Sequence, residues 1–359
     1  MSTSTTPEAA LDVPFPIAID EALGEKLQPN EAADVTKMAN VISGTIHKQY
    51  SQGDAKRDVH AKATGILKAQ FTVNQDLPPQ FAKGVFVPGK TYEAYIRLSN
   101  ASGNAHQNDD SQDGRGFAIK LLGVPGPKLL ESDKDATTQD FVFINRPFFF
   151  VSNTHTYLTF FESLDSSSPL QKLTGFLKLG LKSAALAVWQ ASGKIANPLQ
   201  QQYYSAVPYQ LGMGEDRQAV KYSVKPVSPA HDPLPALPTP DYLHEAVKTT
   251  LSNGEVQFKF MVQPKVGEHM DVEDSRVEWK ESESPFQEVA TITIPQQDVD
   301  AAETVALGER MSFNSWHSLA EHRPLGSLNR ARKVVYERIS RVRDGINHVP
   351  REEPSSLSG

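Results

Sequence analysis

The chain has 359 residues, and its 36 Lys and Arg against 43 Asp and Glu leave a formal net charge of −7 at pH 7. Hydrophobic residues make up 39% of it and charged residues 22%, a balance that excludes a disordered or fibrous chain. It contains no cysteine, which excludes disulfides, thiolate nucleophiles, zinc fingers and iron–sulfur clusters. The acidic balance and the lack of a basic run argue against nucleic acid as a partner.

Residues 1–28 carry small polar residues and three early prolines, which favours an extended arm, weakly ordered or wrapped on a partner. The first Lys is Lys26 and no early apolar stretch is long enough for a secretory signal, so we expect a cytoplasmic protein. The longest apolar stretch, 173–189, is interrupted by Lys178 and Lys182 and is too short and too charged to span a bilayer. It predicts a buried or half-buried helix.

The periodicity of the remaining chain predicts a closed antiparallel β-barrel of about eight strands with surrounding helices, in the α+β class. A helix is expected over 31–50 with Asn30 as its N-cap, and 157–195 is helical in period. We expect residues 29–346 to form one domain, followed by a short C-terminal tail, 347–359. Strands are predicted at 65–73, 91–100, 116–123, 140–145, 219–227, 256–266 and 289–294, and further helices near 239–252 and 324–346.

The common short motifs of nucleotide, zinc, calcium and serine-hydrolase sites are missing from the sequence. Asp109, Asp110 and Asp113 cluster without EF-hand spacing, so a solvated acidic turn is favoured over a calcium site. His317 and His322 stand five residues apart, which would place them on different faces of a helix and argues against a zinc pair. The aromatic run 148–150 is interpreted as barrel core.

His60 differs from the other histidines because it sits where helix gives way to the first predicted strand, within the sequence Arg-Asp-Val-His-Ala-Lys that begins at Arg57. Four further motifs follow in order. They are Arg-Leu-Ser at 97–99, Gly-Arg-Gly-Phe-Ala-Ile-Lys at 114–120, Asn-Arg-Pro with three Phe at 145–150, and Arg-Lys-Val-Val-Tyr at 332–336. This ordered set, spanning about residues 55–345, resembles the haem catalase superfamily.

The resemblance implies a haem b cofactor, with Tyr336 as the proximal ligand of its iron, His60 as the distal histidine and Asn145 as the distal amide. Physical chemistry agrees with these roles. Arg332 and Tyr336 are i, i+4 on a predicted helix, where the guanidinium can favour the phenolate that binds Fe(III). An imidazole can move the proton during peroxide cleavage, and Ser99 can fix its orientation. The resemblance places the haem propionates on Arg57, Arg97 and Arg343, with Arg341 in reserve.

Typical catalases are longer, and the segments around 197–212 and 315–326 look like those of compact catalase-related peroxidases and hydroperoxide-metabolising enzymes. We therefore expect an oxidoreductase that cleaves the O–O bond of hydrogen peroxide or organic hydroperoxides, lipid hydroperoxides among them, through a more open channel. A fatty-acid hydroperoxide isomerase or lyase, a compact true catalase and a non-enzymatic haem-binding barrel remain alternatives. A homo-oligomer, with a dimer favoured, is expected by analogy.

Overall fold

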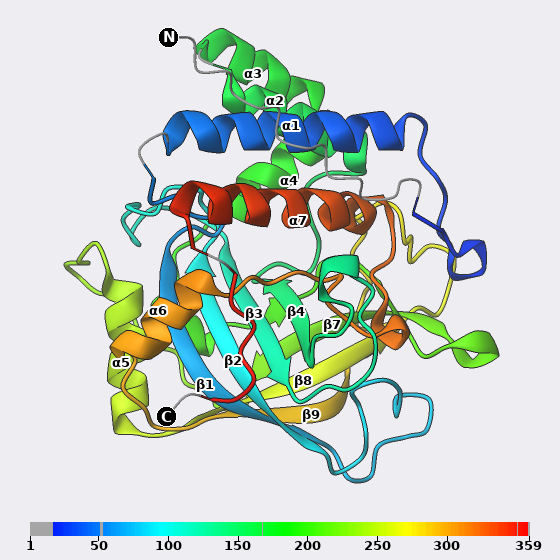
Figure 1. Ribbon diagram of the computed structural model, residues 1–359, viewed down its shortest axis with the longest axis vertical. Helices are drawn as coiled ribbons and strands as arrows, with labels where there is room; N and C mark the ends of the chain where they lie inside the picture. The colour runs from blue at the N-terminus through cyan, green and yellow to red at the C-terminus, as the bar shows by residue number, and fades with distance from the viewer. Residues whose placement is uncertain (1–16, 51–52, 167, 350, 358–359) are drawn as a thin grey trace.

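The computed structural model describes residues 17–50, 53–166, 168–349 and 351–357 (Figure 1). Its strands form one antiparallel sheet in the order β5-β4-β3-β2-β1-β9-β8-β7-β6, and β5 also pairs with β7. That pairing closes a ring of eight strands with β6 attached to β7, which confirms the predicted barrel. The strands are β1 (Ala63–Val73), β2 (Thr91–Asn100), β3 (Arg115–Leu122), β4 (Thr138–Ile144), β5 (Tyr203–Tyr204), β6 (Tyr209–Leu211), β7 (Gln218–Pro226), β8 (Val256–Pro264) and β9 (Gln287–Ile294).

Alternation of side chains along the strands fills the barrel with apolar residues. In β1, Leu67, Ala69 and Phe71 are buried, whereas Gln70 and Thr72 between and beside them face outward. An aromatic stack continues this core from the other strands, with ring centroids 5.1 to 5.6 Å apart for the pairs Phe71–Phe260, Phe141–Phe260 and Tyr222–Phe260. The barrel is therefore a packed core, and any site must lie at one of its ends.

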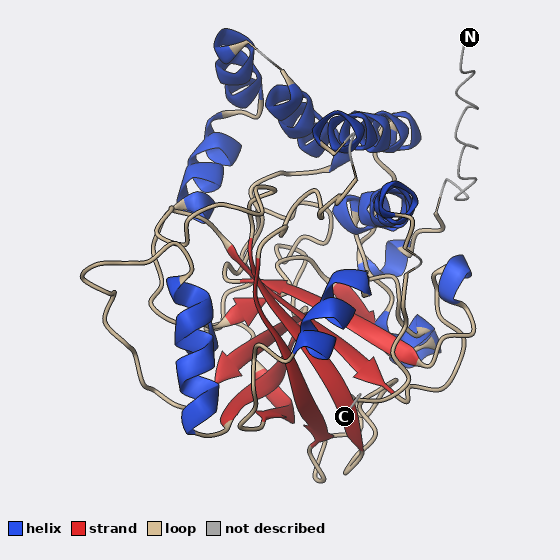
Figure 2. Cartoon of the chain, turned by 60° about the vertical axis from the view of Figure 1, so that its left-hand side comes forward, coloured by secondary structure: helices blue, strands red, loops and turns tan. Residues whose placement is uncertain are grey.

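Helices gather beyond one end of the barrel (Figure 2). Contacts join α1 with α2 and α7, and α2 with α7 and α3, while α5 and α6 pack outside β1. The helices are α1 (Glu31–Gln49), α2 (Thr154–Asp165), α3 (Pro169–Lys178), α4 (Leu181–Ala191), α5 (Tyr242–Asn253), α6 (Ala302–Arg310) and α7 (Ser327–Asn347). The predicted helices agree with α1, α2 to α4, α5 and α7. Helix α6 and the two- and three-residue strands β5 and β6 were not predicted, because they are too short to show a period.

The interpretation of 173–189 as a buried or half-buried helix was wrong. Gly180, with φ 84°, separates two helices, α3 and α4. Leu173, Leu177 and Leu181 are 57%, 59% and 87% exposed. The sequence showed apolar residues but not which element would cover them.

Of two smaller predictions, the N-cap position of Asn30 was confirmed and the solvated turn at Asp109 was wrong. Asn30 stands at the N-cap position of α1 with φ 60°, but its side chain makes no capping bond, and Glu31 accepts the Gln28 N–H at 3.0 Å instead. Asp109 is fully buried and does not lie in a solvated turn. It accepts hydrogen bonds from Lys62 Nζ at 2.8 Å, from Asn100 Nδ2 at 2.7 Å and from the Leu243 N–H at 3.0 Å. These donors replace water, which is why an acidic residue is tolerated there.

A buried ion-pair cluster fixes the start of α7. The fully buried guanidinium of Arg330 lies 2.8 Å from Glu25, 2.7 Å from Glu31 and 3.1 Å from Glu273. The carboxylates of Glu25 and Glu273 also accept the N–H groups of Gly326 and Ser327 at 2.9 and 2.8 Å. They thus cap α7, whose own N-cap is a glycine with no side chain to do so. Glu25 belongs to the N-terminal segment, of which 1–16 lie outside the described residues, so 17–28 packs on this same chain.

Replacing Arg330 by Leu should lower the free energy of unfolding by about 3–5 kcal/mol, because three buried carboxylates would lose their shared cation. Arg341→Leu is the matched control on the same helix, since the Arg341 side chain is 52% exposed and pairs only with Glu337 one turn away. We expect that control to change stability by about 0.5 kcal/mol or less. Denaturant unfolding of both variants measures this, and equal effects would contradict the assigned role of the cluster.

Candidate functional site

Four strand ends meet at the barrel mouth that the helices cover. The antiparallel pairings Ala63↔Ser99, Ser99↔Gly116 and Gly116↔Ile144 place the start of β1, the end of β2, the start of β3 and the end of β4 side by side. A cavity of about 670 Å³ lies between these ends and helices α1, α2 and α7. The predicted site residues that line it are Arg57, His60, Arg97, Ser99, Arg332, Tyr336 and Arg343. Residues more than 270 positions apart in the chain therefore share one chamber.

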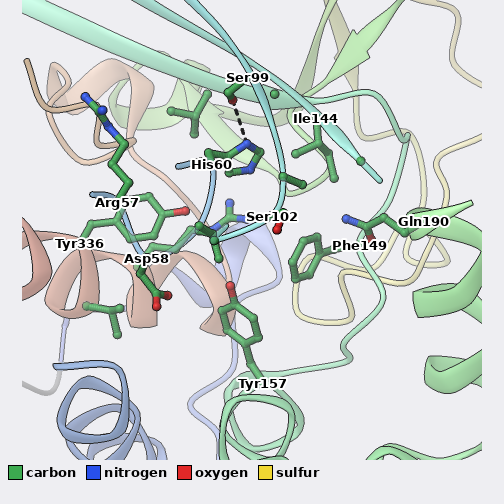
Figure 3. Close-up of a pocket in the computed structure, with 18 of the residues that line it drawn as sticks. Arg57, Asp58, His60, Ser99, Ser102, Ile144, Phe149, Tyr157, Gln190 and Tyr336 are labelled. Atoms are coloured by element: carbon green, nitrogen blue, oxygen red, sulfur yellow. Dashed lines mark hydrogen bonds between the residues drawn. The ribbon is translucent and has the colours of Figure 1, made fainter. Parts of the chain in front are cut away.

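His60 is held in a strained backbone conformation at the cavity wall. Its φ of 58° lies in the left-handed region, which residues other than glycine rarely adopt and which clusters at functional sites. Its N–H donates to the Ala101 carbonyl at 3.0 Å, and its Nδ1 lies 3.0 Å from Ser99 Oγ (Figure 3). The bond to Ser99, which the sequence predicted, leaves Nε2 as the ring nitrogen available to a ligand.

The imidazole of His60 is neutral over the ordinary pH range. Burial, with repulsion from Arg97 and Arg332, lowers its pKa to about 3. A neutral imidazole can accept a proton, but with this low pKa it is a weak base until a negative charge nearby raises the pKa.

Gly116 leaves the space that the His60 ring occupies, a role that the sequence analysis did not assign. A Cβ at this position would lie 2.5 Å from His60 Nδ1 and 2.7 Å from Ser99 Oγ, closer than atoms can approach. The pair Gly114 and Gly116 around a single Arg was a visible signal, but only the pairing of β2 with β3 shows which side chains need the space.

Asn145 lies at the end of β4, but it is not among the described residues that line the cavity. Its Oδ1 accepts the Arg115 N–H at 2.8 Å, so this amide joins β3 to β4. An amide does reach the cavity from α4, where Gln190 lines the wall and its buried Oε1 has no hydrogen-bond partner among the described residues. Figure 3 shows Gln190 beside Ser102 and Phe149. No motif marked Gln190 in the sequence.

Three arginines, Arg57, Arg97 and Arg343, place positive charge in the wall. Arg57 lies 3.8 Å from Glu309 and Arg343 lies 3.4 Å from Asp344, yet the three cations still repel one another. Arg57 donates to the carbonyls of Gly308 and Met311 at 2.8 Å, and Arg97 donates to the His60 carbonyl at 2.7 Å. Burial and repulsion from Arg97 and Arg343 lower the pKa of Arg57 well below its ordinary value. Burial, with repulsion from Arg343, lowers the pKa of Arg97 to about 10, despite attraction from Glu309. Such a cluster favours an anionic ligand, because each bound negative charge would relieve the repulsion.

Tyr336 reaches the cavity from α7, one turn after Arg332. Burial disfavours the charged Arg332, but the oxygens of Tyr336, Tyr157 and Tyr209 outweigh it and hold the pKa of Arg332 above its ordinary value. The guanidinium also lies 5.7 Å from the centre of the Phe149 ring. In Figure 3 the hydroxyls of Tyr336 and Tyr157 point toward the space that His60 also faces. The interpretation of 148–150 as barrel core was incomplete, because Phe149 and Phe150 line the cavity.

A second cluster of possible metal ligands lies apart from this cavity. Ligand atoms of Asp133, His317 and Glu353 lie within 4.8 Å of one another. However, Asp133 pairs with Arg351, and Glu353 lies 3.0 Å from Lys120. The carboxylates already have cations, so the cluster acts as an ion-pair network. His322 is buried in the aromatic core, where burial lowers its pKa to about 3 and its Nε2 accepts the Val85 N–H at 3.0 Å.

Asp58, also on the wall, should make stability depend on pH, because burial raises its pKa from 3.8 to about 6. A raised folded-state pKa stabilises the protein below pH 4, and this contribution is lost as the pH rises through 6. Asp58→Asn should therefore gain about 2–3 kcal/mol in free energy of unfolding over the wild type between pH 4 and pH 8. Denaturant titrations at both pH values measure this. Asp54→Asn, at an exposed carboxylate, is the control, and parallel curves for Asp58→Asn would contradict the assignment.

Comparisons with known proteins agree with this arrangement. The family model described as Catalase matches residues 45–190. A catalase-related peroxidase from Mycolicibacterium paratuberculosis (strain ATCC BAA-968 / K-10) is 24% identical over 304 residues, covering 83% of this chain and 92% of that protein.

The fold matches solved catalase structures at 17% identity. A fungal catalase superposes with a TM-score of 0.66 over 84% of this chain and 63% of its own, so this chain spans less than two thirds of that protein. Catalase A from Saccharomyces cerevisiae gives 0.62 over 88% and 68%, and a bacterial catalase gives 0.63 over 97% and 68%. The chain is thus similar to the catalase family over residues 45–190 and to a catalase-related peroxidase over most of its length, and it has the fold of the solved catalases.

Proposed function

We propose that this protein is a haem b enzyme that cleaves the O–O bond of hydrogen peroxide or organic hydroperoxides, as a catalase-related peroxidase. The observation that carries the proposal is one cavity that holds a neutral His60 fixed by Ser99 together with Tyr336, Arg332 and a cluster of three mutually repelling arginines. Neither the barrel nor the ion-pair cluster of Arg330 requires these residues in the cavity, so they are best explained by a cofactor and a reaction.

The wall residues fit a haem. Arg57, Arg97 and Arg343 would bind its two propionates, whose negative charges meet the repulsion among these buried cations. Phe149 and Phe150 supply apolar wall for the porphyrin, and Tyr336 supplies an oxygen ligand for the iron. Arg332, one turn before Tyr336 on α7, would add a positive charge beside this ligand. When bound, the haem supplies the electrons that break the O–O bond.

His60 moves the proton in this proposal. Ser99 holds Nδ1, so Nε2 is the nitrogen that acts on the peroxide. It takes the proton from one peroxide oxygen and gives it to the other, which then leaves in its protonated form instead of as an anion. With a pKa of about 3, His60 is a weak base in the protein alone. The anionic propionates would raise this pKa and make the imidazole a better acceptor of the proton. Asn145 remains the proposed distal amide by family resemblance, and Gln190 is a second amide whose buried oxygen has no partner among the described residues.

Hydroperoxide isomerisation or cleavage is the second candidate, and one observation favours a bulky substrate. The cavity wall continues outward along Leu164, Phe176 and Val188, of which Leu164 and Val188 are 54% and 62% exposed. An apolar chain could follow that path, whereas hydrogen peroxide gains nothing from it.

Haem-loaded protein should consume an organic hydroperoxide in the presence of a phenolic reductant while releasing little oxygen from hydrogen peroxide. An oxygen electrode and a hydroperoxide assay with and without the reductant measure this. Vigorous oxygen release would identify a compact catalase instead. Loss of a lipid hydroperoxide without reductant would favour the isomerase or lyase, and a haem spectrum insensitive to peroxide would favour a haem-binding barrel without chemistry.

Replacing His60 by Ala should lower peroxide turnover by about 10²–10⁴-fold while the haem spectrum remains, because the proton acceptor is lost and the arginines and Tyr336 are kept. Stopped-flow spectroscopy of the haem-loaded variant measures the rate. His155→Ala is the control, because the His155 side chain is 73% exposed.

Gly116→Ala tests the positioning of the same ring, since the new methyl group would displace the His60–Ser99 pair. Gly44→Ala is its matched control, because a Cβ at Gly44 meets nothing within 4 Å.

Full turnover in the His60→Ala variant would refute the proposed mechanism.

A further inference from the structure

Helices α3 and α4, which follow each other in the chain and are here called the α3–α4 segment, present apolar residues that the described protein leaves uncovered. Leu170, Leu173 and Leu177 lie on one face of α3 at helical spacing and are 69%, 57% and 59% exposed. On α4, Leu181 and Val188 are also exposed, at 87% and 62%. Single exposed apolar residues are ordinary, but a row at helical spacing on neighbouring helices marks an interaction surface.

The α3–α4 segment is packed against the rest of the protein on one side. The inner face of α3 packs closely on α2, because any side chain at Gly175 would overlap Ser163, and Leu179 is buried. Helix α3 lies at the outer edge of the helical layer, away from the barrel (Figures 1 and 2). Its leucines therefore point outward although α3 has a well-packed inner side.

The charge of this segment is opposite to that of the whole chain. Between Asp165 and Glu215 there is no acidic residue, whereas Lys172, Lys178 and Lys182 flank the exposed leucines. On the neighbouring helix α2, Glu162 lies 2.5 Å from Lys37 and Asp165 lies 3.2 Å from Lys48, both lysines of α1. Asp274 is close enough to Lys182 for their charges to attract, which leaves Lys172 and Lys178 as the cations beside the leucines of α3. In a chain of net charge −7, this is an apolar surface with a positive rim.

Trp189 adds a residue typical of membrane interfaces. It is 41% exposed at the end of α4, and its ring is held by stacking on Phe148 at 5.1 Å and by Arg146 at 4.5 Å. Leucines inserted below, lysines beside them and a tryptophan at the boundary form the pattern of helices that lie in the headgroup region of a bilayer. In the described part of the chain, no helix is long and apolar enough to cross a membrane.

The α3–α4 segment also borders the cavity. Phe176 of α3, Val188 of α4 and Leu164 of α2 line the cavity wall, and Leu164 and Val188 are also exposed beside the leucine row. The apolar surface and the cavity wall are therefore continuous.

We propose that the α3–α4 segment docks on the surface of a bilayer containing anionic phospholipids. Leu170, Leu173, Leu177 and Leu181 enter the headgroup region, the lysines meet the lipid phosphates, and the mouth of the cavity faces the lipid. The second consequence rests on the proposed function, since it makes lipid hydroperoxides the substrates supplied by this surface. A second copy of this chain is the other occupant that such a face could take, and the test below separates the two.

Flotation of the haem-loaded, full-length protein with vesicles of phosphatidylcholine and phosphatidylglycerol tests the docking directly. We expect the protein to float with these vesicles, less with phosphatidylcholine alone, and less at high salt. Trp189 reports insertion, because Trp279 and Trp316 are only 3% and 2% exposed, and brominated acyl chains should quench it selectively. The double variant Leu173→Asp with Leu177→Asp should lower vesicle partitioning at least about tenfold and keep hydrogen peroxide turnover, because neither residue lines the cavity.

Leu237→Asp is the matched control, since Leu237 is 92% exposed on the loop at 231–240, and this variant should float as the wild type does. Wild-type protein that stays in the aqueous fraction with unquenched Trp189 would overturn the proposal. A dimer in size-exclusion chromatography that the double variant dissociates, with no flotation, would identify a second copy as the occupant. Flotation requires no peroxide chemistry, so its outcome is independent of whether the proposed reaction is correct.

Discussion

The shared pairing of Arg330 with Glu25, Glu31 and Glu273 is the interaction on which the candidate site depends. It joins the N-terminal segment, α1, the segment after β8 and α7 through one fully buried guanidinium. Helix α7 cannot cap itself, because a glycine precedes it, so these carboxylates set where the helix begins. Arg332 and Tyr336 follow within two turns, and their position over the barrel mouth is therefore set by charges that take no part in the proposed chemistry. Buried ion pairs of this kind add little net stability, but breaking one leaves costly unpaired charges, which makes the arrangement specific.

The cavity itself has the opposite electrostatic character. Around Arg330 the carboxylates outnumber the guanidinium, whereas Arg57, Arg97 and Arg343 face one another with too few anions nearby. The protein holds this repulsion by tying Arg57 and Arg97 to backbone carbonyls, which fix the side chains without neutralising them. His60 feels the same positive field and stays neutral. An anionic cofactor would therefore fill space, balance charge and change the basicity of the proposed catalytic residue in one event.

The sequence predicted most of the barrel, because the longer strands alternate in a simple pattern and their ends carry turn residues. It also predicted that His60, Ser99, Arg97 and Tyr336 would matter, since their motifs occur in order, and the structure brings all four to one cavity. The wall contributions of Asp58, Gly116 and Gln190 were missed for physical reasons. Gly116 acts through the space it leaves across a strand pair, and Gln190 reaches the cavity only because α4 folds back over it. The exposure of the α3–α4 leucines could not be predicted either, because a periodic apolar face looks the same whether or not another element covers it.

The separation in sequence of the partners around Arg330 has a consequence for how this chain folds. Glu25 and Arg330 are 305 residues apart, and β1 completes the barrel only by pairing with β9. Arg351 and Glu353, nearly at the end of the chain, supply the last cations and anions of the network around His317. Glu25 therefore stays hydrated until Arg330 has been synthesised and the loops between them have closed. Long-range contacts of this kind slow folding, because the chain loses the conformational entropy of closing a large loop before the contact can stabilise it. We therefore expect the contacts around Arg330 to form late in folding, after the long loops between its partners have closed.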